Sequence, residues 1–322
     1  MISGTATAES ISVVVPVYNS EQIIPQFVAR LEPVLCTLTP RFELILVNDG
    51  SRDGSWNVIC DVAARHPWIR GMNLMRNYGQ HNALLAGIRA ARGDVIVTMD
   101  DDLQHPPDQI PKLLAKLSEG YDVVYGTPET EAHNLGRVLA SRITKLALQS
   151  AMGSVVARHV SAFRAFRASV CESFAGYRSP YVCIDVLLTW GTTRFAAVVA
   201  RHEARLIGVS SYTVRKLVVH ALNMMTGFST VPLQLASIVG FVFTFVGLAV
   251  FSFVVGRYVI QGGSVPGFPF LASIIAMFSG AQLFALGILG EYMARMHLRT
   301  MERPAYVVAA SAGCQDAGKI GP

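Results

Sequence analysis

The chain has 322 residues, of which 52% are hydrophobic and only 15% are charged, whereas about 25% of residues are charged in an average soluble domain. The mean hydropathy of +0.40 therefore predicts that apolar residues are concentrated in one part of the chain. The net charge of +5 favours an anionic partner such as a phosphate or a lipid headgroup. Because Lys and Arg form no compact run, we expect no binding to nucleic acid.

The five cysteines are scattered, and none belongs to a CxxC pair. This pattern argues against a disulfide framework or a zinc site and suits a reducing cytoplasm. Residues 1–10 are polar and lack the apolar core of a secretion signal. We therefore expect no cleaved signal peptide.

Short apolar runs alternate with helical patterns from residue 11 to about residue 201. The expected strands cover residues 11–17, 42–47, 69–74, 95–99 and 123–125. The expected helices cover residues 20–35, 56–65 and 82–92, and a fourth runs from Pro106 to near Gly120. This alternation predicts an α/β domain with a parallel sheet that is covered on both faces.

Polar clusters follow three of the expected strands: Tyr18-Asn19, Asn48-Asp49 and Asp100-Asp101-Asp102. Ligands of such sheets bind beyond the carboxyl ends of the strands, so three clusters at one edge favour a site over ordinary polar loops. Asp100 and Asp102 are two residues apart and can share a face. Their carboxylates are the hard oxygen ligands that Mg²⁺ or Mn²⁺ prefers.

Two long apolar stretches dominate the C-terminal part: residues 231–259, uncharged before Arg257, and residues 268–290. Each is long enough for a membrane span of about 20 residues, and only a short uncharged linker separates them. Buried core helices are the alternative, but two neighbouring stretches favour a transmembrane hairpin. Basic residues flank the pair on its outer sides, at positions 215 and 216 and at 295, 299 and 303. The positive-inside rule then places the catalytic domain and both termini in the cytoplasm, on a multi-pass protein of the inner membrane.

Two further segments are amphipathic, residues 135–152 and residues 214–228. Both could pack on a protein core, as such helices ordinarily do. Because the second segment adjoins the expected hairpin, we expect it to lie in the membrane interface. The two interpretations are evenly balanced for the first segment.

Several motifs together resemble the inverting family 2 glycosyltransferases, and more narrowly the dolichyl- and undecaprenyl-phosphate sugar transferases. They are VVVPVYN at 13–19, VNDGS at 47–51, RNYGQ at 76–80, MDDDLQHPP at 99–107, GILGEY at 287–292 and ERP at 302–304. Arg205, Gly208, Ser210 and Tyr212 resemble the juxtamembrane motif of that group. The resemblance covers most of the chain, and its motifs are specific in combination rather than singly.

The resemblance implies a GT-A domain over residues 8–212, an interfacial helix over 213–229, transmembrane helices over 230–260 and 267–294, and a cytoplasmic tail over 295–322. It implies transfer of a sugar from a nucleotide-sugar, a UDP-sugar, to a polyprenyl phosphate with Mg²⁺ or Mn²⁺. A homo-oligomer is compatible with this interpretation. The rival hypotheses are a transferase with a saccharide acceptor and a catalytically silent scaffold that binds nucleotide-sugar in the membrane.

The same resemblance implies roles for particular residues. Asp100 and Asp102 would hold the metal, and the donor would contact Pro16, Tyr18, Asn19, Asp49, Arg76, Asp101 and Gln104. Asp49 could instead cap the Gly50-Ser51 turn, and Arg76 could be an ordinary surface residue. The acceptor phosphate would contact Arg137, Arg205, Ser210, Tyr212, Arg215 and Lys216, although basic residues also attract membranes without specific binding.

The chain departs from the family pattern at Ala162, where many members have an Asp that is proposed as a base. Ser211 replaces a Lys of the juxtamembrane motif, and residues 127–131 lack the usual arginines. The acceptor phosphate has a second pKa of about 6, so it needs little deprotonation at neutral pH. Arg164 could orient the acceptor. Asp185 is a further candidate catalytic carboxylate. The equal alternative is a structural role, in which Asp185 is hydrogen-bonded inside the protein.

Overall fold

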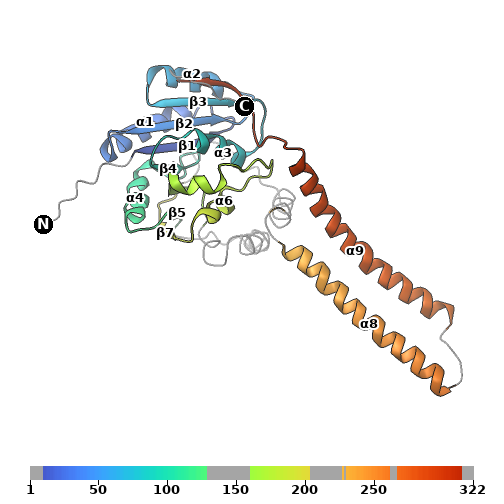
Figure 1. Cartoon of the computed structure of the whole chain (residues 1–322). Coiled ribbons are helices and arrows are strands. Elements are labelled where there is room, and N and C mark those ends of the chain that lie inside the picture. Colours follow the sequence, from blue (N-terminus) through green and yellow to red (C-terminus); the bar gives the residue numbers. More distant parts are fainter. Residues whose placement is uncertain (1–9, 129–159, 204–226, 228–229, 262–266, 314–322) are drawn as a thin grey trace.

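The computed structural model describes residues 10–128, 160–203, 227, 230–261 and 267–313 (Figure 1). An α/β domain carries one mixed sheet, and a long helical hairpin projects from it. The two amphipathic segments lie outside the described residues, apart from Gly227. The same holds for six predicted acceptor residues, Arg137, Arg205, Ser210, Tyr212, Arg215 and Lys216.

The eight strands lie in the order β7-β5-β6-β4-β1-β2-β3-β8. The expected strands are all present: β1 (Ile11–Val17), β2 (Phe42–Asn48), β3 (Ile69–Leu74), β4 (Val95–Thr98) and β5 (Val123–Thr127). The first four are mutually parallel. Three strands were not expected: β6 (Arg164–Arg167), β7 (Phe195–Val199) and β8 (Val308–Ala312). Because β6 and β8 run antiparallel to their neighbours, the sheet is mixed rather than wholly parallel.

Helices cover both faces of the sheet, as the sequence predicted. On one face, α1 (Ile24–Leu38), α2 (Ser55–Arg65) and α4 (Ile110–Ser118) pack over alternate strand residues such as Val13 and Val15. On the other, α3 (Gln80–Ala90) and α6 (Ile184–Gly191) pack over the intervening positions such as Val14. Alternate side chains of a strand point to opposite faces, so an apolar run such as β1 supplies both cores.

The described part of the domain also contains two short helices, η1 (Pro107–Gln109) and η3 (Ala168–Phe174). The first helix begins at Ile24 rather than at residue 20. Ser20 instead forms a turn in which its carbonyl accepts hydrogen bonds from the amides of Ile23 and Ile24. The polar end of β1 is therefore free of helical structure.

The hairpin consists of α8 (Val231–Gln261) and α9 (Phe268–Thr300), which lie side by side in Figure 1. Phe243 meets Phe278 edge-on with ring centroids 5.7 Å apart. The segment Val231–Arg257 has a mean hydropathy of 2.6 and is largely unburied, so this helix is long and apolar enough to cross a membrane.

The chain returns from the hairpin to the sheet. Beyond residue 294, α9 continues to Thr300, and β8 then pairs with the edge strand β3. The buried side chain of Asn82 donates hydrogen bonds to the carbonyls of Ala305 (2.8 Å) and Pro180 (3.1 Å). The start of α3 is thus fixed to the segment that leaves the hairpin.

Candidate active site

Three predicted polar clusters meet at the carboxyl edge of the sheet. Strand β1 lies between β2 and β4, with Val17 opposite Asn48 and Val14 opposite Thr98. The loops after these strands carry Tyr18 and Asn19, Asp49, and Asp100 to Asp102. Parallel strands end at the same edge, so segments that are distant in sequence form one site.

The loop after β1 is fixed to the loop after β2. Asn19 has a left-handed backbone with φ 55°, which Asn tolerates better than most residues. Its amide donates to Ser51 Oγ (2.9 Å), and its side-chain oxygen accepts from the amide of Arg52 (2.9 Å). Tyr18 is 48% exposed at this edge, while Pro16 is buried within β1. Tyr18 and Asn19 are both exposed, but the amide and side-chain oxygen of Asn19 are hydrogen-bonded within the loops, so Tyr18 offers a ligand the larger accessible surface.

Asp49 holds the loop at residues 76–79. Its carboxylate accepts hydrogen bonds from the amides of Tyr78 (2.7 Å) and Gly79 (2.9 Å). Burial raises the pKa of Asp49, and these two amides act against that rise. A Cβ on Gly50 would lie 2.5 Å from the backbone of Arg76, so only glycine permits this close approach. The turn cap that was an alternative role for Asp49 belongs to Asn48, whose side chain accepts from the amide of Ser51 (3.4 Å).

The three aspartates follow β4 in a sharp turn, in which Leu103 has φ 59°. Asp100 Oδ1 accepts from Gln80 Nε2 (2.6 Å), and the buried Asp102 accepts from the amide of Gln104 (3.1 Å). Asp101 Oδ2 is buried and has no hydrogen-bond partner within the described part of the chain. Burial, helped by Asp102 and opposed by the Ser20 hydroxyl, raises the pKa of Asp101 to about 6. Such concentrated negative charge with an unsatisfied oxygen suits a hard divalent cation.

His105 lies next to the aspartates and stacks on Phe163 with ring centroids 5.3 Å apart. Its Nδ1 is also buried and lacks a hydrogen-bond partner among the described residues. Burial and the neighbouring His202, 4.9 Å away between centroids, lower the pKa of His105 to about 4. A neutral imidazole nitrogen is a metal ligand. No sequence pattern singled out His202, because it follows β7, a strand that was not expected.

Arg164 and Asp185 lie in the core rather than on the surface. Arg164 is 1% exposed and Asp185 4% exposed, and the Arg164 guanidinium pairs with Asp185 Oδ1. Tyr125 donates its hydroxyl to the same oxygen (3.1 Å), and Arg164 Nε donates to Thr98 Oγ1 (2.9 Å). This arrangement argues against the hypothesis that Arg164 orients the acceptor, because its guanidinium is paired with Asp185 inside the protein. It favours the structural alternative for Asp185.

A second group of potential metal ligands comprises His81, Cys183 and Asp185, whose ligand atoms lie within 4.8 Å of one another. Asp185 is already engaged by Arg164 and Tyr125. Burial raises the pKa of the Cys183 thiol to about 12, so the thiol stays protonated at neutral pH. This group is therefore a poorer cation site than the aspartates after β4.

The remaining predicted donor residues lie at the rim. Arg76 is exposed, and its guanidinium lies 4.6 Å from the centre of the Tyr78 ring. Gln104 is half-buried, and its carbonyl accepts from the amide of Glu203 (2.8 Å). Thus Gln104 connects the aspartate loop to the segment after β7.

Residues 12–174 match the model of the family "Glycosyl transferase family 2". This match, together with the sheet and the acidic loop described above, shows that the chain belongs to the family 2 glycosyltransferases. The undecaprenyl-phosphate 4-deoxy-4-formamido-L-arabinose transferase of Pseudomonas savastanoi pv. phaseolicola is 33% identical over 302 residues, which cover 92% of this chain and 89% of that protein. The Yersinia enterocolitica serotype O:8 protein of the same name is 34% identical over 322 residues, covering 98% and 97%.

A solved structure of glucosyl-3-phosphoglycerate synthase from Mycobacterium tuberculosis, in complex with Mn²⁺, UDP-glucose and phosphoglyceric acid, matches with a TM-score of 0.50. The two chains are 21% identical, and the match covers 68% of this chain and 78% of that chain. At this identity the likeness concerns the fold. The predicted GT-A fold and family are confirmed.

Proposed function

We propose that the chain transfers a sugar from a UDP-sugar to undecaprenyl phosphate, with inversion at the anomeric carbon. The observation that carries this proposal is the loop Asp100 to Asp102, which meets the loops after β1 and β2 at the carboxyl edge of the sheet. The full-length relatives named above add the acceptor, since their names specify undecaprenyl phosphate.

In this proposal the donor lies across the three loops. Tyr18 offers an exposed ring to the base, and Asp49 shapes the wall through its bonds to the amides of Tyr78 and Gly79. Asp100 and Asp102 would hold a divalent cation, Mg²⁺ or Mn²⁺, with Asp101 and His105 beside them. When bound, the cation supplies positive charge against the negative charge that develops on the leaving diphosphate.

The transfer is a single displacement. A phosphate oxygen of the lipid attacks the anomeric carbon, and the bond from that carbon to the diphosphate breaks. The bonding electron pair leaves with UDP. Because the lipid phosphate has a second pKa of about 6, the attacking oxygen is already largely ionised at neutral pH. A general base is therefore dispensable, which accounts for Ala162 at the position where the family pattern described above has an Asp. Positioning of the reactants and neutralisation of charge supply the catalysis.

The membrane placement belongs to the same proposal. Both α8 and α9 would cross the inner membrane, with the catalytic domain and both termini in the cytoplasm. The apolar, unburied window of α8 supports one crossing. The return of the chain from α9 into the sheet at β8 supports the second, because both ends of the hairpin then lie on the catalytic side.

Purified full-length protein, incubated with undecaprenyl phosphate, Mg²⁺ or Mn²⁺ and a panel of labelled nucleotide-sugars, tests this proposal. The 4-deoxy-4-formamido-L-arabinose donor named for the relatives is the first member of the panel. We expect label in the organic phase with wild type and Asp108→Asn, and none with Asp102→Asn. Asp108 is the matched control, because it is an exposed aspartate of the same segment whose ion pair with Arg201 lies on the surface.

A catalytically silent scaffold predicts a different result. It binds nucleotide-sugar without labelling any lipid, whichever donor is supplied. Labelling of a soluble saccharide in place of the lipid would favour the saccharide-acceptor hypothesis. Both outcomes would overturn the proposed reaction.

A further inference from the structure

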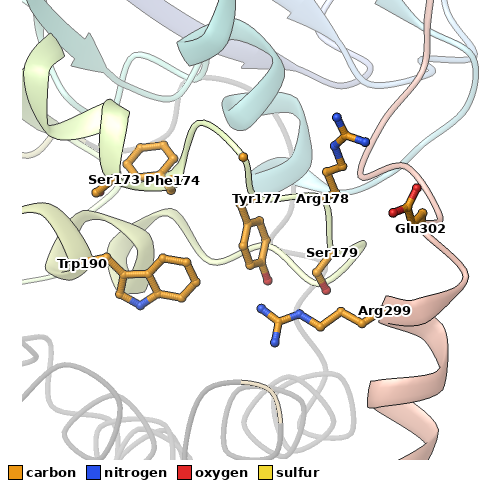
Figure 2. A pocket seen from close by; sticks show the side chains of 9 residues that line it. Ser173, Phe174, Tyr177, Arg178, Ser179, Trp190, Arg299 and Glu302 are labelled. Carbon is orange, nitrogen blue, oxygen red and sulfur yellow. The ribbon is translucent and has the colours of Figure 1, made fainter. Parts of the chain in front are cut away.

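A cavity of about 340 Å³ lies where the end of α9 meets the catalytic domain (Figure 2), and no residue of the aspartate loop is among its lining residues. Its walls come from η3, the loop at residues 176–179, the end of α6 and the end of α9. The sugar-transfer chemistry proposed above uses none of these segments. Ligand pockets commonly measure about 300–1,000 Å³, so this cavity suits a headgroup rather than a whole nucleotide-sugar.

The cavity is lined by two cationic side chains, Arg178 and Arg299. Among the described residues, neither Arg178 nor Arg299 forms an ion pair, whereas Arg295, one turn before Arg299, pairs with Glu291 (2.8 Å). Figure 2 shows Arg299 reaching from the end of α9 towards Tyr177. Its guanidinium lies 6.0 Å from the centre of that ring. Glu302 also lines the cavity, which leaves one net positive charge.

Aromatic side chains form the opposite wall. Trp190 is 48% exposed and meets Tyr177 edge-on with ring centroids 5.5 Å apart. Figure 2 places Trp190 across from the cationic end of α9. A large exposed indole next to arginines is typical of the headgroup level of a membrane, where Trp and Tyr gather and cations attract phosphates.

The position of the hairpin places the cavity near the headgroup level of the membrane. A Cβ on Gly227 would lie 3.6 Å from Arg295 Nη1, so this part of α9 is beside Gly227, which precedes the apolar segment of α8. Arg299 lies one helical turn, about 5–6 Å, further along α9. The cavity therefore opens close to the cytoplasmic boundary of the proposed membrane segment.

We propose that this cavity binds the phosphate headgroup of a membrane lipid, with Arg299 and Arg178 as the cationic contacts and Trp190 as the apolar wall. The inference rests on the membrane placement proposed above and not on the sugar-transfer reaction. The two candidate ligands, an anionic phospholipid and a polyprenyl phosphate, both carry such a phosphate group.

The test measures lipid retained by full-length protein in native mass spectrometry after exchange into phosphatidylglycerol, undecaprenyl phosphate or phosphatidylcholine. Arg178→Gln and Arg299→Gln should each retain about fivefold less anionic lipid, the change expected from one basic residue at a membrane surface. Arg303→Gln, a nearby exposed arginine outside the cavity, should retain as much as wild type. Thermal melting confirms that the variants are folded.

The lipid arms identify the source of the phosphate. Selective retention of phosphatidylglycerol would show that the cavity binds a phospholipid. Selective retention of undecaprenyl phosphate would show that it binds the lipid acceptor. Equal retention by all four proteins, or retention of phosphatidylcholine as strong as that of both anionic lipids, would overturn the inference. Flotation of wild type with phosphatidylglycerol vesicles tests the membrane placement separately. A failure of wild type to float with the vesicles would count against the membrane placement, so the two failures are distinguishable.

Discussion

The buried pair of Arg164 and Asp185 gives a prediction that separates a structural role from a catalytic one. Both side chains are almost wholly enclosed. Removing one member of such a pair leaves a buried charge without a partner, which costs about 3–5 kcal/mol. Both Asp185→Asn and Arg164→Met should therefore melt roughly 6–20 °C below wild type, at about 2–4 °C per kcal/mol for a domain of this size.

The double variant makes this test sharper. With both Arg164→Met and Asp185→Asn, neither charge of the pair remains in the core. Burial raises the pKa of Tyr125 well above its usual value, so the phenol stays protonated and can still donate to the amide oxygen that replaces the Asp185 carboxylate. The double variant should therefore melt closer to wild type than either single variant. A double-mutant cycle should give a coupling energy of up to about 3 kcal/mol.

Melting of the detergent-purified proteins is followed by tryptophan fluorescence, and turnover is measured per folded molecule. The structural account predicts that folded Asp185→Asn keeps near-normal turnover at low temperature. If Asp185→Asn instead melted with wild type and lost its turnover, the structural account would be refuted and Asp185 would act in the reaction.

Three further predictions concern the edge of the sheet and the returning strand. The pKa of Asp101 is about 6 in the folded protein against 3.8 for the ordinary group, so the free energy of unfolding should fall as pH rises from about 4 to about 6, by at most about 3 kcal/mol. Asp101→Asn should abolish this fall in melts made with EDTA, and an unchanged pH profile would contradict the assignment. Asp49→Asn should raise the KM for the nucleotide-sugar about tenfold with a smaller change in kcat, because the side-chain NH2 of Asn cannot accept from a loop amide and one of the two hydrogen bonds is lost; steady-state kinetics would show an unaltered KM if the loop were held otherwise. Deleting the chain from residue 308 onwards should expose the edge of β3 and promote self-association in size-exclusion chromatography, whereas a monodisperse protein that melts like wild type would show that β8 is dispensable.

Local patterns predict the central part of this fold well. Strands β1 to β5 are apolar runs bounded by turn residues, and their observed bounds differ from the expected ones by at most two residues. The unexpected strands lack such a signal. β6 begins and ends with arginine, and β8 consists of small residues whose partner β3 is distant in sequence. Only the tertiary structure reveals these pairings.

The candidate site is likewise only partly predictable from the sequence. The three polar clusters are predictable, because strand order and direction bring the loops together whatever their contacts are. Contacts between elements are not predictable in this way. The sequence marks Asp185 as an unusual carboxylate on an apolar helix, but its partnership with Arg164 depends on how α6 lies relative to β6 in the fold. The same is true of the histidine pair, which forms only because the segment after β7 returns to the aspartate loop.

The most direct test of the central claim counts both products of one reaction. Wild-type protein with Mn²⁺ and a labelled UDP-sugar should release one UDP for each sugar that enters the lipid phase, and only when undecaprenyl phosphate is present. Asp102→Asn should form neither product. Release of UDP at the same rate without the lipid, or lipid labelling that persists in Asp102→Asn, would contradict the account.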